Sequence, residues 1–114
     1  MSHKVFVYGT LKDCDVNDSF QVQGELYDLG AFPGIKLVGD KFISGQILNV
    51  TNEELENLDK YEGVPRLYSR KKVIASPIEA PEFEKDEFIE AWVYEYNGDI
   101  NRFHQIDTWI TQWI

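Results

Sequence analysis

The sequence predicts an α+β fold of about six strands and two helices. Segments of strand length, apolar or alternating, recur over residues 5–50 and again over residues 67–96. One short stretch with helical signals separates the two groups, and a longer one follows the second group. Because the strands come in runs and do not alternate with helices, an α+β arrangement is favoured over a parallel α/β sheet. The length of 114 residues suits one domain over residues 1–114.

The first half of the chain predicts four strands. Residues 5–8 are an apolar run that stops at a small-residue turn, and residues 20–27 alternate apolar and polar side chains. Alternation of this kind is typical of a strand with one buried face. Residues 35–38 and 42–50 predict the next two strands, and Gly39-Asp40 between them is typical of a hairpin turn.

A short helix is predicted from Thr51 to residue 61. Thr51 and Glu54 have the spacing of a capping box, in which each side chain accepts a hydrogen bond from the other residue's backbone. The helical pattern ends at Glu62-Gly63, with Pro65 just beyond, where a helix cannot continue. Glu62 is therefore expected at a helix end beside a turn.

The second half predicts two more strands and a C-terminal helix. The strands cover residues 67–75 and 88–96, and residues 76–87 form an acidic, proline-containing loop between them. The apolar positions change parity along the first of these strands, which predicts a bulge near Lys71-Lys72. Residues 99–114 predict an amphipathic helix, because apolar side chains recur there at three- and four-residue spacing. These side chains are Ile100, Phe103, Ile106, Ile110 and Trp113.

Composition narrows the class of protein. Apolar residues make up 43% of the chain and aromatic residues 14%, which is enough for a folded core. A formal charge of −9 works against sequence-independent binding to nucleic acid. No apolar stretch has the length of a membrane span, and no signal peptide precedes the first strand, so a cytoplasmic protein without a membrane partner is expected.

No metal site or cofactor is expected. Residues 13–24 begin like a calcium-binding loop, but Asp18 stands where the loop needs glycine and Gly24 where it needs glutamate. His3 and His104 do not have the spacing of metal ligands. Cys14 lies between two aspartates, which disfavour the thiolate that a nucleophilic cysteine requires.

Two segments carry residues that could bind an anion and transfer a proton. Gly9 follows the first strand and allows the backbone to turn or to approach a ligand closely. Backbone N–H groups at such a turn bind anions. Glu62, at the end of the short helix, is a candidate general base. One segment thus offers hydrogen-bond donors and the other offers a carboxylate.

These segments, VFVYGTL at residues 5–11 and LDKYEG at residues 58–63, together with YSR at residues 68–70, resemble the gamma-glutamylcyclotransferase-like family. Further similar segments bring the resemblance to about residue 96. They are GELYDLG at residues 24–30, FPG at residues 32–34, SGQI at residues 44–47 and AWVY at residues 91–94.

The resemblance implies a fold, a reaction and a set of site residues. The fold is a small mixed β-barrel flanked by helices. The reaction is the cyclisation of a small-molecule gamma-glutamyl amine or peptide, without a cofactor, to 5-oxoproline and the free amine. Glu62 is implied as the general acid/base. The implied substrate-binding residues are Tyr8, Gly9, Thr10, Leu11, Tyr68 and Arg70.

Several alternatives stay open at this point. The same scaffold could serve as a non-catalytic module that binds a small molecule or peptide, and an exposed Glu62 would favour that interpretation. A protein-interaction role would use the acidic loop at residues 79–87 or Trp109 and Trp113. Arg70 either contacts substrate, orients Glu62 or lies in a solvated basic patch, and the oligomeric state is open.

Overall fold

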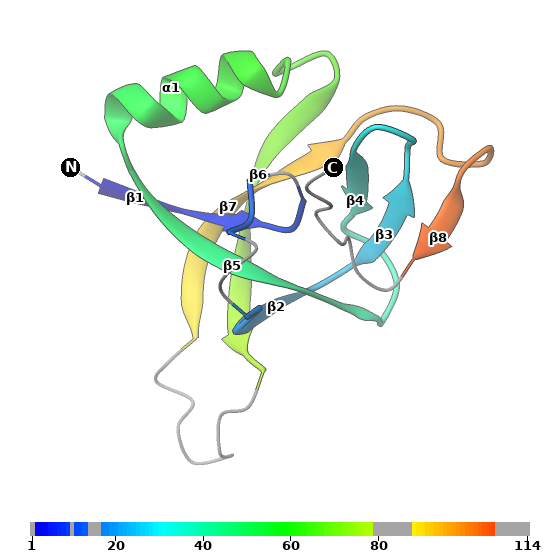
Figure 1. Ribbon diagram of the computed structural model, residues 1–114, viewed down its shortest axis with the longest axis horizontal. Helices are drawn as coiled ribbons and strands as arrows, with labels where there is room; N and C mark the ends of the chain where they lie inside the picture. Colours follow the sequence, from blue (N-terminus) through cyan, green and yellow to red (C-terminus); the bar gives the residue numbers. More distant parts are fainter. Residues whose placement is uncertain (1, 10, 14–16, 79–87, 107–114) are drawn as a thin grey trace.

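The computed structural model describes residues 2–9, 11–13, 17–78 and 88–106, and within them it contains eight strands and one helix (Figure 1). The α+β class is therefore confirmed. The elements are β1 (Ser2–Val7), β2 (Phe20–Gln23), β3 (Glu25–Asp28), β4 (Pro33–Lys36), β5 (Phe42–Thr51), α1 (Asn52–Tyr61), β6 (Tyr68–Pro77), β7 (Ile89–Tyr96) and β8 (His104–Ile106).

Five of the strands form a closed ring in the order β1-β5-β2-β6-β7, and β7 pairs back with β1. The closing contact is parallel, with Val5 opposite Trp92. The other pairs of neighbours in the ring are antiparallel. The ring is thus a mixed sheet in which the N-terminal strand lies beside a strand from near the other end of the chain.

Three short strands extend the sheet beyond β7 in the order β4, β3, β8. The predicted continuous strand over residues 20–27 is wrong in one respect, because it breaks at Gly24 into β2 in the ring and β3 in the extension. A Cβ at Gly24 would lie 2.9 Å from the carbonyl oxygen of Lys36, so glycine permits this break. The predicted hairpin at Gly39-Asp40 is also wrong, since β4 pairs with β3 and not with β5.

Both faces of the ring are buried, in two separate apolar clusters. Phe6 belongs to the first cluster, which draws on all five ring strands. Val5 and Val7 on either side of it belong to the second, which also holds Leu55 of α1. Figure 1 shows α1 lying across one side of the ring, where it covers this second cluster.

Burial of both faces also explains the change of parity along β6, and the predicted bulge is wrong. The β6–β7 register runs without interruption from Tyr68 opposite Tyr96 to Ala75 opposite Ile89. Tyr68 belongs to the second cluster and Ala75 to the first, so their opposite parity reflects two buried faces.

The predicted C-terminal helix is wrong in the part that the structure describes. Residues 104–106 form β8, in which Ile106 lies opposite Leu26 of β3. The rest of the predicted helix, with Trp109 and Trp113, and the acidic loop at residues 79–87 lie outside the described residues.

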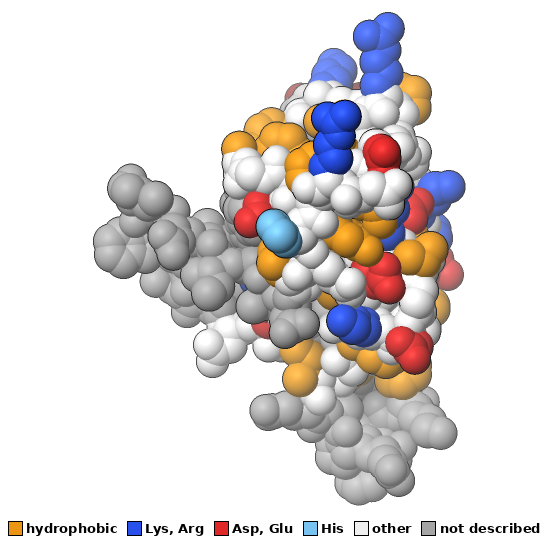
Figure 2. Space-filling model, turned by 90° about the vertical axis from the view of Figure 1, so that its right-hand side faces the viewer, with side chains coloured by type: hydrophobic (Ala, Val, Ile, Leu, Met, Phe, Trp, Pro, Cys, Tyr) orange, Lys and Arg blue, Asp and Glu red, His pale blue; other side chains and the backbone are white. Residues whose placement is uncertain are grey.

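Figure 2, which views the molecule from the side of β3 and β8, shows acidic and basic side chains intermixed, with hydrophobic ones between them. No helix of the described chain combines the length and the apolar character that crossing a bilayer requires.

Candidate functional site

Glu62 is held at the C-terminus of α1 by local backbone hydrogen bonds. The predicted capping box fixes the other end of this helix, with Thr51 Oγ1 accepting from the backbone N–H of Glu54 at 3.1 Å. Beyond Glu62, the N–H of Gly63 donates to Lys60 and that of Val64 to Asp59, the two bonds of a Schellman motif. Gly63 has φ +69°, a conformation that favours glycine. The predicted position of Glu62, at a helix end before a turn, is therefore confirmed.

Glu62 lines a cavity of about 370 Å³, a volume that includes space open to solvent. Burial raises the pKa of this carboxyl group to about 7. Desolvation has this effect because it penalises the charged form of a carboxyl group. The other residues lining the cavity are Phe6, Val7, Tyr8, Gly9, Leu11, Phe32, Pro33, Tyr68 and Tyr94.

The turn after β1 reaches the same cavity as Glu62. Gly9 and Leu11 both line it, and the backbone N–H of Lys12 donates to the carbonyl oxygen of Gly9 at 3.0 Å. A Cβ at Gly9 would lie 2.6 Å from Cγ of Pro33, closer than atoms pack, so the turn needs glycine here to lie against that ring. The structure thus brings together Gly9, Leu11 and Glu62, while Thr10 lies outside the described residues.

The hydroxyl groups of Tyr8 and Tyr68 are bonded to the backbone around the cavity. Tyr8 donates to the carbonyl oxygen of Tyr94 at 2.6 Å and accepts from the N–H of Ile35 at 3.3 Å. Tyr68 donates to the carbonyl oxygen of Pro33 at 2.8 Å. Burial raises the pKa of both tyrosines above the ordinary value, so both remain uncharged. These residues shape the cavity wall with their rings.

Arg70 does not line the cavity. Its Nη1 lies 2.9 Å from Oδ2 of Asp59, and its guanidinium lies 4.4 Å from the ring centroid of Trp92. The other carboxylate oxygen of Asp59 accepts from the hydroxyl of Tyr94 at 2.8 Å. Asp59 thus connects Arg70 to a tyrosine of the cavity wall, and none of the ion pairs among the described residues includes Glu62.

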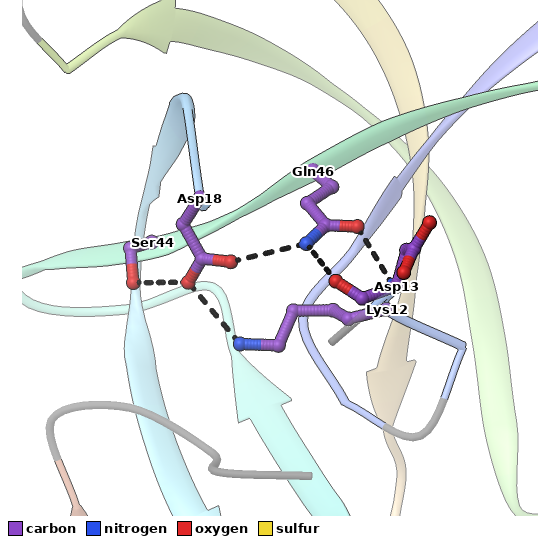
Figure 3. Close-up of polar contacts among 5 residues, drawn as sticks. All are labelled: Lys12, Asp13, Asp18, Ser44 and Gln46. Atoms are coloured by element: carbon purple, nitrogen blue, oxygen red, sulfur yellow. Dashed lines mark hydrogen bonds and ion pairs between the residues drawn. The ribbon is translucent and has the colours of Figure 1, made fainter. Parts of the chain in front are cut away.

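A polar network holds the segment that follows the turn (Figure 3). Lys12 Nζ and Ser44 Oγ both donate to Oδ2 of Asp18, at 3.1 and 2.9 Å. The side-chain amide of Gln46 donates to the backbone oxygen of Asp13 and accepts from its N–H, both at 2.9 Å. Since Ser44 and Gln46 belong to β5, this network fixes the chain after Gly9 to the ring.

Sequence reasoning assigned no site role to Phe32, Pro33, Tyr94 or Asp59. Pro33 contacts Gly9 and accepts the hydrogen bond of Tyr68, so it connects the turn to the opposite wall. The only signals were that these four residues lie in the family-like segments FPG, AWVY and LDKYEG, and that Asp59 precedes Glu62 by three residues. Neither signal by itself indicates a site.

Comparison with known proteins gives matches over most of the chain. The family model described as "Gamma-glutamyl cyclotransferase, AIG2-like" matches residues 5–111. A Vibrio cholerae protein named "Putative gamma-glutamylcyclotransferase" is 35% identical over an aligned length of 118 residues. The alignment covers 93% of this chain and 91% of that protein.

Two solved structures are similar in fold. A solution structure of an Arabidopsis thaliana protein has a TM-score of 0.70 and 27% identity, and the match covers 90% of this chain and 75% of that one. A crystal structure of an AIG2-like protein from Mus musculus also has a TM-score of 0.70, with 21% identity and coverage of 94% and 87%. The strand arrangement described above is therefore shared with solved structures.

Proposed function

The chain belongs to the AIG2-like gamma-glutamyl cyclotransferase family, and on that premise we propose that it cyclises a gamma-glutamyl amine to 5-oxoproline and the free amine. The observation that carries this proposal is the shared cavity. A carboxyl group with a pKa of about 7 and the turn after β1 line the same space.

In the proposed reaction the nucleophile is part of the substrate. Glu62 accepts a proton from the α-ammonium group, and the resulting amine attacks the γ-carbonyl carbon, forming the ring C–N bond. The protonated Glu62 then delivers its proton to the leaving nitrogen as the old C–N bond breaks. The ring nitrogen releases its extra proton to solvent or back to Glu62. Bonds, protons and charges balance without a cofactor.

The raised pKa of Glu62 supports its role as acid and base. A group that must first take and then give a proton works best when its pKa lies near the working pH. Burial supplies this shift in the structure, and the arginine that could oppose it is paired with Asp59. The half-burial of Glu62 also favours an enzyme over the alternative of a non-catalytic binding module, which an exposed carboxylate would favour.

The turn and the tyrosines are assigned the task of binding. We assign the backbone N–H groups of Gly9, Thr10 and Leu11 to the glutamyl part of the substrate and to the oxyanion that develops on attack. The rings of Tyr8 and Tyr68 exclude water and keep the chain folded for attack. Arg70, which lies outside the cavity lining, is a positioning residue in this proposal.

Product analysis and a pH profile test this proposal. Incubation with a panel of gamma-glutamyl amines is expected to release 5-oxoproline and free amine in equal amounts. The value of kcat/KM should rise with pH through about 7 and then level, because Glu62 must be deprotonated to accept a proton. Absence of 5-oxoproline with every amine, or a rate that falls as pH rises through this range, would contradict the proposal.

A further inference from the structure

We infer that a second hollow next to the cavity is the subsite for the leaving amine and favours amines with an uncharged, apolar substituent. This inference rests on the proposed function and deepens it. We call this space the outer hollow; its volume is about 580 Å³, which includes space open to solvent. Its lining residues are Ala31, Phe32, Tyr61, Glu62, Leu67 and Tyr68.

The outer hollow adjoins the cavity and shares part of its wall. Phe32, Glu62 and Tyr68 line both spaces. The rings of Phe32 and Tyr68 lie next to each other, with centroids 6.4 Å apart. Glu62 therefore lies where the two spaces meet. A group that donates a proton to the leaving nitrogen has to lie at such a position, between the glutamyl part and the amine. If the glutamyl part fills the cavity beside Gly9, the amine on the other side of the scissile bond extends into the outer hollow.

The walls of the outer hollow expose apolar surface. Tyr61 is 67% exposed, Leu67 42% and Phe32 37%. Soluble proteins seldom leave several large apolar side chains together at the surface unless they contact a ligand or partner. Here the three side chains surround a hollow that adjoins the proposed reaction centre, so the occupant that suits them is the substituent of the substrate's own amine.

The backbone around Leu67 is fixed, so this wall is already formed before a ligand binds. The N–H of Leu67 donates to Gly63, and its carbonyl oxygen accepts from Asn97, both at 2.9 Å. The side-chain amide of Asn97 also donates to the carbonyl oxygen of Pro65 at 2.8 Å. Because the wall is already in place, binding of the amine does not require the free energy of ordering it. The shape and polarity of the wall can therefore select among amines.

The charges of the outer hollow disfavour ionic substituents. Its described lining includes no lysine or arginine, and Glu62 is its only carboxylate. An anionic substituent would be repelled by Glu62. A cationic substituent would lose hydration against apolar walls, and near Glu62 it would favour the ionised carboxylate and weaken it as a base. An apolar substituent incurs neither cost.

A matched pair of substrates tests this inference. The gamma-glutamyl amides of pentylamine and cadaverine differ only by the terminal ammonium group. We expect kcat/KM to be about tenfold higher for the pentylamine compound, the scale of discrimination that apolar pockets reach. Leu67→Ser should reduce this preference several-fold, whereas Ile74→Ser, which changes an exposed apolar residue of β6 outside the hollow, should leave it unchanged.

The same compounds separate failure of the inference from failure of the proposed function. Release of 5-oxoproline at equal rates from both amides, or faster from the cadaverine compound, would overturn the apolar subsite and leave the reaction intact. Release from neither amide, nor from any other, would contradict the reaction. Equilibrium binding to Glu62→Gln, which is expected to bind both amides without converting them, measures the preference of the subsite independently of the reaction. About tenfold tighter binding of the pentylamine compound supports the subsite, and equal binding or no binding overturns it.

Discussion

Arg70 of β6 forms an ion pair with Asp59 of α1, in which Nη1 lies 2.9 Å from Oδ2. Asp59 precedes Glu62 by three residues. The same carboxylate accepts from the hydroxyl of Tyr94 in the cavity wall. Asp59 therefore binds the side chains of both Arg70 and Tyr94 and fixes their positions relative to α1. Burial raises the pKa of the proposed base, and none of the ion pairs among the described residues joins this arginine to Glu62.

Arg70→Gln tests whether this arginine contacts substrate. We expect KM to change less than about threefold, since Arg70 is not part of the cavity lining. Stability should fall by about 1 kcal/mol, the usual range for a partly exposed ion pair. Steady-state kinetics and urea unfolding of the two proteins measure both effects. A KM raised tenfold or more would show that Arg70 binds substrate directly.

The stability of the protein should depend on pH through Glu62. Its pKa of about 7 in the folded state lies above the ordinary value of 4.5, so the folded state binds this proton more tightly. The resulting stabilisation is present below about pH 4.5 and is lost as pH rises through about 7. Thermal unfolding from pH 4.5 to 8 should therefore show wild type losing stability relative to Glu62→Gln. Glu56→Gln, at an exposed position of α1, is the control and should follow wild type.

Gly9→Ala should destabilise the turn after β1. The added methyl group would lie 2.6 Å from Cγ of Pro33, so the turn or the proline must move. Overpacking of this kind costs about 1–3 kcal/mol. The double variant with Pro33→Ala removes the obstructing atoms, and a double-mutant cycle measured by urea unfolding should show that the two changes are coupled. Purely additive effects would mean that the contact with Pro33 is not what requires glycine.

Local signals in the sequence were sufficient to place Glu62. The capping box at Thr51 and Glu54 and the glycine after Glu62 determine where the helix begins and ends, and all act within a few residues. The spacing of apolar side chains along the sequence likewise indicated most of the strands. These features are set by short-range hydrogen bonds and steric limits, which a single sequence displays directly.

Features that depend on distant partners could not be predicted in this way. The alternating segment divides at Gly24 because β2 and β3 pair with different strands. The residues around Gly24 do not indicate which strands these are. Closure of the ring needs Val5 opposite Trp92, a contact between segments far apart in the chain. The pairing of Asp59 with Tyr94 is equally non-local. Apolar spacing at residues 99–114 predicted a helix, but pairing with β3 makes residues 104–106 a strand.

Glu62 is proposed to transfer the proton in the shared cavity, and the rate of 5-oxoproline release by Glu62→Gln tests this role most directly. Glutamine is similar in shape but cannot take up the proton. We expect the rate to fall by at least about a hundredfold, the lower range of general acid/base catalysis, while the gamma-glutamyl amine still binds. Glu56→Gln should keep the wild-type rate. Turnover by Glu62→Gln within a few-fold of wild type would contradict the account.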